Sequence, residues 1–297
     1  MSRYLCRMFY TSNQLAGIKR AEITRLTQFY PYHEAENMMN MLIMHFLGLS
    51  RVMQQLQVDK QLSESEMLAV HGAVKRLLNN EPIQYVLGDT MFYGLRLEVN
   101  ANVLIPRPET EELVEIIVKD VHKEDTDILD IGTGSGCIAL ALKNNLVQSR
   151  ISAVDISEEA LSLARKNAKN LQLDVNFLRC NILDTAACLK TFDKYFDIIV
   201  SNPPYVLQKE KEQMSGNVLD YEPHLALFVE DNDPLIFYRK IMRFADKFLR
   251  SGGKLYFEIN ENYAEETAAL FCKDIFETPD IQIDINGKKR FIAVRKY

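Results

Sequence analysis

The segment that decides the fold is residues 127–136, which read Asp-Ile-Leu-Asp-Ile-Gly-Thr-Gly-Ser-Gly. Its first half is a short, mainly apolar run that predicts a buried strand, and its glycines allow a tight turn into a helix over residues 137–146. Strands and helices then alternate: strands are predicted at 151–155, 175–179 and 196–200, and a helix at 158–171. This alternation predicts a doubly wound, mainly parallel α/β sheet.

Both ends of the chain differ from this alternating region. Residues 281–285 and 291–295 predict a closing antiparallel pair of strands, because Asn286-Gly287 between them is a strong hairpin signal. Residues 1–80 instead carry apolar side chains at spacings of three and four, which predicts helices. The predicted fold class is therefore α/β with a small helical domain at the N-terminus.

The helical region and the segment after it carry more local signals. Residues 63–66, Ser-Glu-Ser-Glu, match a capping box that opens a helix running to about Leu78. The methionine-rich stripe of this region is typical of core packing, and the alternative is a docking face for a protein partner. The alternating pattern from Gln84 to Leu104 predicts a β-hairpin linker. We therefore predict a helical docking domain, a hairpin linker and a cofactor-binding domain, with bounds at 1–80, 81–110 and 111–297.

The composition narrows the possible functions. The 297 residues are 47% hydrophobic and 26% charged, as in an ordinary soluble globular protein. The net charge of −6 makes the chain a poor generic nucleic-acid binder, because phosphate affinity comes largely from lysine and arginine. The most apolar N-terminal run, Met38 to Leu49, is too short to span a bilayer, and we see no signal-peptide pattern.

The cysteines indicate the redox setting. There are five of them, an odd number without a Cys-x-x-Cys pair: Cys6, Cys137, Cys180, Cys188 and Cys272. We therefore expect reduced thiols in a cytoplasmic protein, and neither disulfides nor a zinc site.

A cofactor site is predicted around the glycine loop at residues 132–136. Asp155 ends the next predicted strand, where a carboxylate accepts hydrogen bonds from ribose hydroxyls. The loop reads Gly-x-Gly-x-Gly, whereas dinucleotide sites use Gly-x-Gly-x-x-Gly, so a tight cradle for a pyrophosphate is less favoured. S-adenosylmethionine, which has a ribose but no phosphate, fits this pattern better.

A second loop, residues 201–205 (Ser-Asn-Pro-Pro-Tyr), follows the predicted strand 196–200. Two consecutive prolines end the strand, because neither has an N–H to donate. The Asn202 side chain and the Pro203 carbonyl then offer two acceptors to a planar NH2 group, and Tyr205 adds an aromatic wall. The alternative is a proline-rich turn with Asn202 as its first residue.

These motifs together resemble class I S-adenosylmethionine-dependent methyltransferases that act on planar nitrogens. Asn-Pro-Pro-Tyr alone is shared with adenine-N6 nucleic-acid methyltransferases and does not select the substrate. Three further stretches are similar to the peptide chain release factor glutamine methyltransferases, the PrmC/HemK family: residues 81–88 (Glu-Pro-Ile-Gln-Tyr-Val-Leu-Gly), 92–94 (Phe-Tyr-Gly) and 105–111 (Ile-Pro-Arg-Pro-Glu-Thr-Glu). Residues 286–291 also resemble that family's ending.

The resemblance implies a Rossmann-like sheet and methylation of the glutamine side-chain amide in the Gly-Gly-Gln motif of bacterial release factors. The cofactor-binding residues that it implies are Gly132, Thr133, Gly134, Ser135, Gly136, Asp155, Asn181, Ile182 and Asn202, with Phe92, Pro106 and Arg107 nearby. The residues that it implies for holding the glutamine are Asn202, Pro203, Pro204 and Tyr205, with Asn202, Pro203 and Tyr205 at the catalytic centre. Two positions depart from the family pattern: Asn260 stands where a glycine is expected, and Ile182 where some members carry an aromatic residue.

The implied partner is a release factor, without direct nucleic-acid or membrane binding, and we expect a monomer. Two rival enzymes share most of the motifs, namely a glutamine methyltransferase of a ribosomal protein and an adenine-N6 nucleic-acid methyltransferase. A non-catalytic scaffold that binds the cofactor is the alternative from another class.

Overall fold

The computed structural model describes Tyr10 and residues 12–297. The chain divides into two compact units, residues 1–88 with 216–221 and residues 89–215 with 222–297. The short segment 216–221 therefore packs with the first unit, and the Tyr221 hydroxyl donates a hydrogen bond to the Asn79 carbonyl (2.7 Å).

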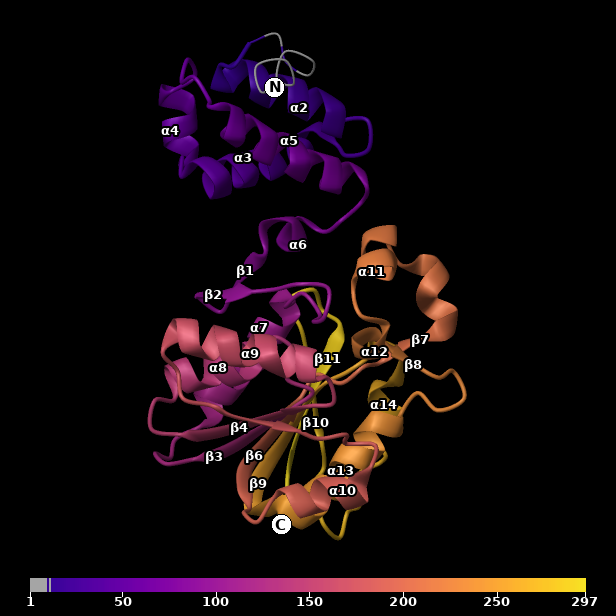
Figure 1. The fold of residues 1–297 in the computed structure, drawn as a ribbon. Helices are drawn as coiled ribbons and strands as arrows, with labels where there is room; N and C mark the ends of the chain where they lie inside the picture. The colour runs from indigo at the N-terminus through magenta and orange to yellow at the C-terminus, as the bar shows by residue number, and fades with distance from the viewer. Residues whose placement is uncertain (1–9, 11) are drawn as a thin grey trace. The chain divides into compact units, whose positions relative to one another are not determined.

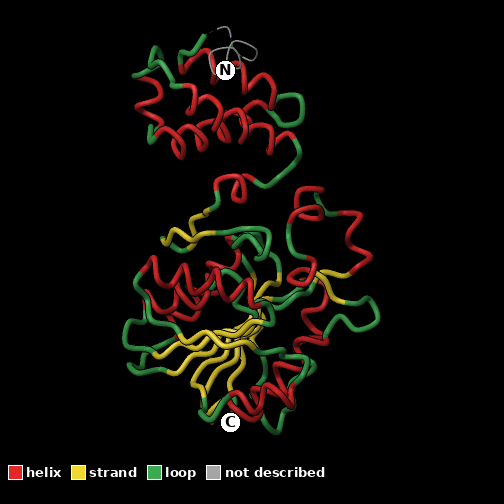
Figure 2. Tube along the Cα trace, viewed as in Figure 1, coloured by secondary structure: helices red, strands yellow, loops and turns green. Residues whose placement is uncertain are grey.

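The first unit is helical throughout its described part, as the apolar spacing predicts (Figure 2). Its helices are α2 (Leu15–Leu26), α3 (Tyr32–Leu47), α4 (Arg51–Leu56), α5 (Glu64–Leu78), α6 (Ile83–Leu87) and α11 (Gly216–Tyr221). The predicted capping box is present at the start of α5, where Ser63 and Glu66 exchange side-chain and backbone hydrogen bonds. The methionines divide between two settings: Met39 lies in the core, whereas Met44 is exposed.

The linker is only partly a hairpin. Helix α6 occupies residues 83–87, so the prediction of a strand pattern from Gln84 was wrong there. Pro82 precedes its first turn, and Gly88, with φ of +82°, ends it in the left-handed conformation that glycine favours. The hairpin itself is confirmed in β1 (Asp89–Phe92) and β2 (Leu95–Glu98).

The second unit is built on a seven-stranded sheet with the order β10-β11-β9-β6-β3-β4-β5 (Figure 1). Strands β3 (Asp127–Ile131), β4 (Arg150–Asp155), β5 (Asn176–Arg179), β6 (Phe196–Ser201) and β9 (Leu249–Glu258) run parallel. Strands β10 (Asp280–Ile283) and β11 (Lys289–Arg295) close the sheet antiparallel, which confirms the predicted fold class.

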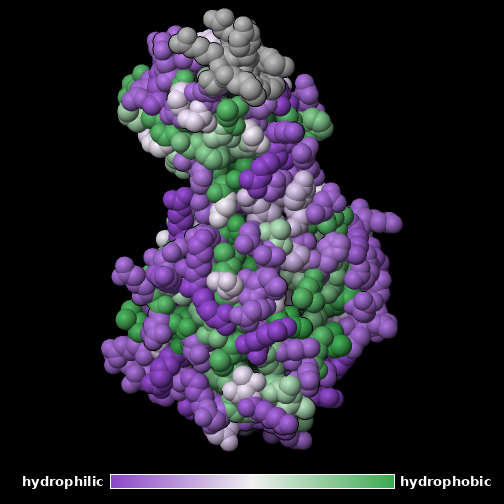
Figure 3. Space-filling model, viewed as in Figure 1, coloured by the Kyte–Doolittle hydropathy of each residue, from purple (hydrophilic) through white to green (hydrophobic). Residues whose placement is uncertain are grey.

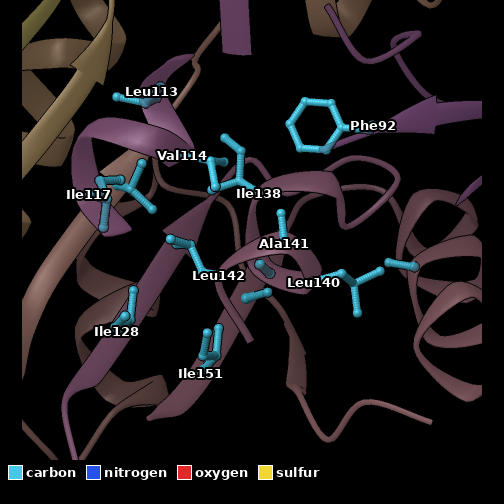
Figure 4. Packing of buried hydrophobic residues seen from close by; sticks show 14 of the residues in the cluster. Phe92, Leu113, Val114, Ile117, Ile128, Ile138, Leu140, Ala141, Leu142 and Ile151 are labelled. Carbon is cyan, nitrogen blue, oxygen red and sulfur yellow. The ribbon is translucent and has the colours of Figure 1, made fainter. Parts of the chain in front are cut away.

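Helices cover both faces of this sheet. One layer contains α7 (Pro108–Asp120), α8 (Cys137–Asn145) and α9 (Glu158–Leu171), and the other contains α10 (Thr185–Thr191), α13 (Ile236–Phe248) and α14 (Ala264–Ala268). Neighbouring strand residues alternate between the two cores: Ile128 packs beneath α7 and α8 (Figure 4), and Leu129 packs on the opposite face. The glycine loop and the Asn-Pro-Pro-Tyr loop therefore both emerge at the carboxyl edge of a sheet that is buried on both sides.

The segment between β6 and α13 contains short elements that the sequence patterns did not predict. They are β7 (Val206–Leu207), the 3₁₀ helix η1 (Gln208–Gln213), α11, α12 (His224–Leu227) and β8 (Phe228–Val229). Polar residues cover most of the face drawn in Figure 3, with apolar residues interspersed. Within the described part of the chain, every helix is too short or too polar to cross a bilayer.

Candidate active site

A cavity of about 270 Å³ lies in the second unit, at the carboxyl ends of the parallel strands. Its walls include the loops that follow β3, β4, β5 and β6, and the side chains of Phe237 and Ile241 from α13. The four strands are neighbours in the order β6-β3-β4-β5, so the loops meet although they are far apart in sequence. Open α/β sheets bind their ligands at this edge.

The glycine loop forms one wall of the cavity. Gly132 and Gly134 line it with φ of +77° and +54°, and a Cβ atom on either would meet no atom within 4 Å. Glycine is therefore required there for the backbone conformation, and the space in front of the loop stays open. Gly136 differs, because a Cβ atom there would lie 3.2 Å from the Cβ atom of Ala164 on α9. Gly136 therefore allows the loop to pack against α9 and does not line the cavity. Thr133 and Ser135 are buried and do not line the cavity either.

Asp155 faces this loop from the end of β4. Its Oδ2 atom accepts a hydrogen bond from the Gly134 N–H (2.9 Å), and its Oδ1 atom accepts one from the Ser157 N–H (3.0 Å). Burial raises the pKa of Asp155, and the hydrogen bonds from the backbone of Ser157 and Gly134 partly oppose this rise. The carboxylate lines the cavity and thereby offers its remaining lone pairs to a ligand.

The loop after β5 adds Asn181 and Ile182 to the wall. The Asn181 Oδ1 atom accepts from the Leu183 N–H (3.0 Å), which fixes the turn. Cys180 and Cys188 are joined here in a disulfide, with Cα atoms 5.7 Å apart, so the prediction of reduced thiols is wrong for this pair. The fold places α10 beside the end of β5, a proximity that a spacing of eight residues does not reveal. Cys137 and Cys272 are free thiols, and Cys6 lies outside the described residues.

The Asn-Pro-Pro-Tyr loop forms the opposite wall. Strand β6 ends at Ser201, whose hydroxyl donates to the Ile131 carbonyl (2.7 Å) and so ties the loop to β3. Asn202, Pro203 and Pro204 line the cavity. Tyr205 does not, because its hydroxyl points to the buried Glu258 carboxylate (3.1 Å) and burial raises its pKa.

Three other candidates lie away from the cavity lining. Phe92 is buried in the core beside α8 and α7 (Figure 4). The Arg107 guanidinium forms an ion pair with the buried Glu222 carboxylate (2.6 Å), which also accepts the Ile105 N–H (3.1 Å). Pro106 stands between these two anchored residues and does not line the cavity either. Their positions indicate that this segment braces the loops of the second unit.

Two family models match the chain. The methyltransferase small domain matches residues 109–220, and the PrmC N-terminal domain matches residues 22–88. The release factor glutamine methyltransferase of Flavobacterium psychrophilum is 45% identical over 276 residues, which are 92% of this chain and 95% of that protein. The protein of the same name from Bacteroides thetaiotaomicron is 42% identical over 91% of this chain and 96% of its own length.

This chain belongs to the release factor glutamine methyltransferase family.

A methyltransferase structure from Pyrococcus furiosus shares the fold, with a TM-score of 0.50 at 19% identity over 75% of this chain and 96% of that one. Within the release factor glutamine methyltransferase family, this member carries asparagine where glycine was expected at position 260. The buried Asn260 side chain donates to the Tyr205 carbonyl (3.2 Å) and accepts from the Asn262 N–H (3.0 Å). Asn260 therefore braces the Asn-Pro-Pro-Tyr loop from behind.

A buried polar network that the sequence motifs do not predict lies below that loop in this family member. Glu258, at the end of β9, accepts hydrogen bonds from Thr110 (2.8 Å) and from Tyr205. Thr110 in turn accepts from the Asn202 side chain (3.2 Å). The signal available in the sequence was an acidic residue directly after the apolar run 255–257. The partners of Glu258 come from α7 and from the loop after β6.

Proposed function

We propose that this chain transfers a methyl group from S-adenosylmethionine to the side-chain amide nitrogen of the glutamine in the Gly-Gly-Gln motif of peptide chain release factors. The observation that carries the proposal is that Asn202 and Pro203 line the same cavity as Asp155 and the glycine loop. An acceptor pair for a planar amide therefore faces a site suited to a nucleoside. Membership of a glutamine methyltransferase family supports the same assignment.

The cofactor fits the residues on the other wall. The Asp155 carboxylate would accept hydrogen bonds from the ribose hydroxyls, and Gly132 and Gly134 would let the ligand approach the backbone closely. Asn181 and Ile182 would flank the adenine. When bound, S-adenosylmethionine supplies a sulfonium-activated methyl group.

The chemistry asked of the protein is mainly alignment. An amide nitrogen is a weak nucleophile because its lone pair is conjugated with the carbonyl, so it must be held in line with the methyl group. Asn202 Oδ1 and the Pro203 carbonyl would each accept one hydrogen of the NH2 group, which fixes its orientation before reaction. The same acceptors stabilise the positive charge that develops on nitrogen, and the proton then leaves to water.

The helical unit is proposed to select the protein substrate. None of the residues that the structure describes in this unit lines the cavity, and several of their large apolar side chains are exposed. Val52, Met53, Leu56 and Val58, on α4 and the turn after it, form such a group. We propose a cytoplasmic monomer that recognises the release factor as a protein rather than through nucleic acid.

A substrate panel tests the assignment. The purified protein is offered labelled S-adenosylmethionine with release factor, with ribosomal protein or with adenine-containing DNA. We expect label in the release factor, removed when its target glutamine is changed to alanine. Label in DNA would support the adenine-N6 alternative, and label in ribosomal protein alone would support the closely related glutamine methyltransferase. Absence of transfer to all three would overturn the proposed enzyme.

A further inference from the structure

Thr110 lies directly beneath the Asn-Pro-Pro-Tyr loop, between Asn202 and Glu258. It sits in the first turn of α7, within the segment 105–111, and its side chain is almost completely buried (2% exposed). Its Oγ1 atom lies between two polar groups, 3.2 Å from Asn202 Nδ2 and 2.8 Å from Glu258 Oε2. A buried hydroxyl in this position has to divide its donor and acceptor capacity between the two neighbours.

The direction of these hydrogen bonds follows from the number of protons available. An ionised carboxylate only accepts, and a threonine hydroxyl has a single hydrogen. If Glu258 is ionised, Thr110 must donate to it, and the remaining lone pairs of Thr110 can only accept from Asn202. The NH2 group of Asn202 is then held against α7, and Oδ1 is the atom left for a ligand.

The geometry around Thr110 gives the same directions. Asn202 Nδ2 faces Thr110 Oγ1, and because an amide NH2 group can only donate, the single Thr110 hydrogen is left for Glu258 Oε2. The second oxygen of Glu258 accepts the Tyr205 hydroxyl (3.1 Å), so both oxygens face donors. Burial raises the pKa of Glu258, and the hydrogen bonds from Thr110 and Tyr205 and the nearby charge of Arg290 oppose this rise only in part. Within the described part of the chain, Asn202 Oδ1 has no hydrogen-bond partner of its own.

We propose that Thr110, held by Glu258, is a positioning residue that fixes the Asn202 amide with its carbonyl oxygen toward the target nitrogen. This inference rests on the proposed function. A site that presents Oδ1 accepts from the NH2 group of glutamine. The reversed amide would present an NH2 group and favour the carboxylate of a glutamate. Thr110 would thereby contribute to substrate specificity without touching the substrate.

The test compares Thr110→Val, which keeps the shape of the side chain but removes the hydroxyl, with Thr110→Ser, which keeps the hydroxyl. We expect Thr110→Val to lower kcat for release factor by roughly 10–100-fold, because misorienting one preorganised group acts on the transition state. Thr110→Ser should restore the rate to within about threefold. S-adenosylmethionine affinity should stay within about threefold in both variants, since Asp155 and the glycine loop are untouched. Equal rates for wild type and Thr110→Val would overturn the inference.

A second readout does not require methyl transfer. In ¹⁵N-labelled protein, the side-chain NH2 resonances of Asn202, assigned by their loss in Asn202→Ala, should exchange slowly with water in wild type and Thr110→Ser. They should exchange at least about tenfold faster in Thr110→Val, where the acceptor is gone. Identical exchange in all three proteins would overturn the positioning role. If the wild-type protein transfers no methyl group, the proposed function is refuted. The orientation of Asn202 is still decided by the exchange measurement, which does not depend on methyl transfer.

Discussion

Replacing Asp155 with alanine should separate ligand binding from folding. In the structure its two oxygens accept the Gly134 and Ser157 N–H groups, and the carboxylate lines the cavity. A bound ribose would add hydrogen bonds to the same charged group. Because hydrogen bonds to a charged group contribute about 1.5–3 kcal/mol, Asp155→Ala should weaken binding by that amount. This corresponds to a loss of affinity of roughly 10–150-fold.

The effect on the stability of the free protein should be much smaller. Removal of the carboxylate leaves two backbone N–H groups without their acceptor, but it also removes the cost of burying a charge, which is what raises the pKa of Asp155. These two effects oppose each other, so we expect the free energy of unfolding to change by only about 1 kcal/mol. Calorimetric titration with S-adenosylmethionine and thermal unfolding measure the two quantities separately.

The matched control is Asp174→Ala, which removes an exposed aspartate before β5. It should leave both the affinity and the unfolding temperature unchanged. If folded Asp155→Ala protein binds S-adenosylmethionine as tightly as wild type, the ribose assignment is refuted. If the variant instead fails to fold, Asp155 is primarily a brace for the glycine loop.

Two further predictions concern stability and partner selection. Burial raises the pKa of Asp130 to about 7, so the native state retains a proton that the unfolded chain releases near pH 4. The free energy of unfolding of wild type, relative to that of Asp130→Asn, should therefore fall by about 2–4 kcal/mol between pH 4 and pH 8. Urea titrations that give parallel pH curves for the two proteins would contradict this. Leu56→Glu changes an exposed side chain of α4 (72% exposed) and should raise KM for intact release factor at least about fivefold without changing the unfolding temperature. The control Val147→Lys (70% exposed) should alter neither quantity. Equal KM values for wild type and Leu56→Glu would exclude this surface from docking.

The sequence predicts those parts of the second unit that depend on local pattern. The apolar run of β3, the glycines after it and the prolines after β6 each specify a local structure by their own chemistry. Asp155 and Asn202 could be placed near the glycine loop because the carboxyl ends of adjacent parallel strands share one edge of the sheet. The position of the cavity follows from the order of the strands, because the loops after β6, β3, β4 and β5 meet at that edge.

Contacts that depend on tertiary packing could not be predicted. Thr110 and Asn202 are 92 residues apart, and Arg107 and Glu222 are 115 apart, so no local pattern links either pair. The interior position of Phe92 and the proximity of Cys180 to Cys188 likewise result from how helices pack on the sheet. At residues 84–87 the alternating pattern predicted a strand, but Pro82 before the segment and Gly88 after it favour the helix that forms there.

Single-turnover methyl transfer by Asn202→Ala tests most directly whether the Asn-Pro-Pro-Tyr loop holds the target amide. The measurement follows label from S-adenosylmethionine to release factor, beside a titration of the cofactor with the same protein. We predict a rate that falls by roughly 10²–10³, because one preorganised acceptor is lost at the reacting nitrogen, while cofactor affinity changes by less than about threefold. A near-normal transfer rate would show that Asn202 does not hold the amide, and residues 201–205 would then be only a proline-rich turn.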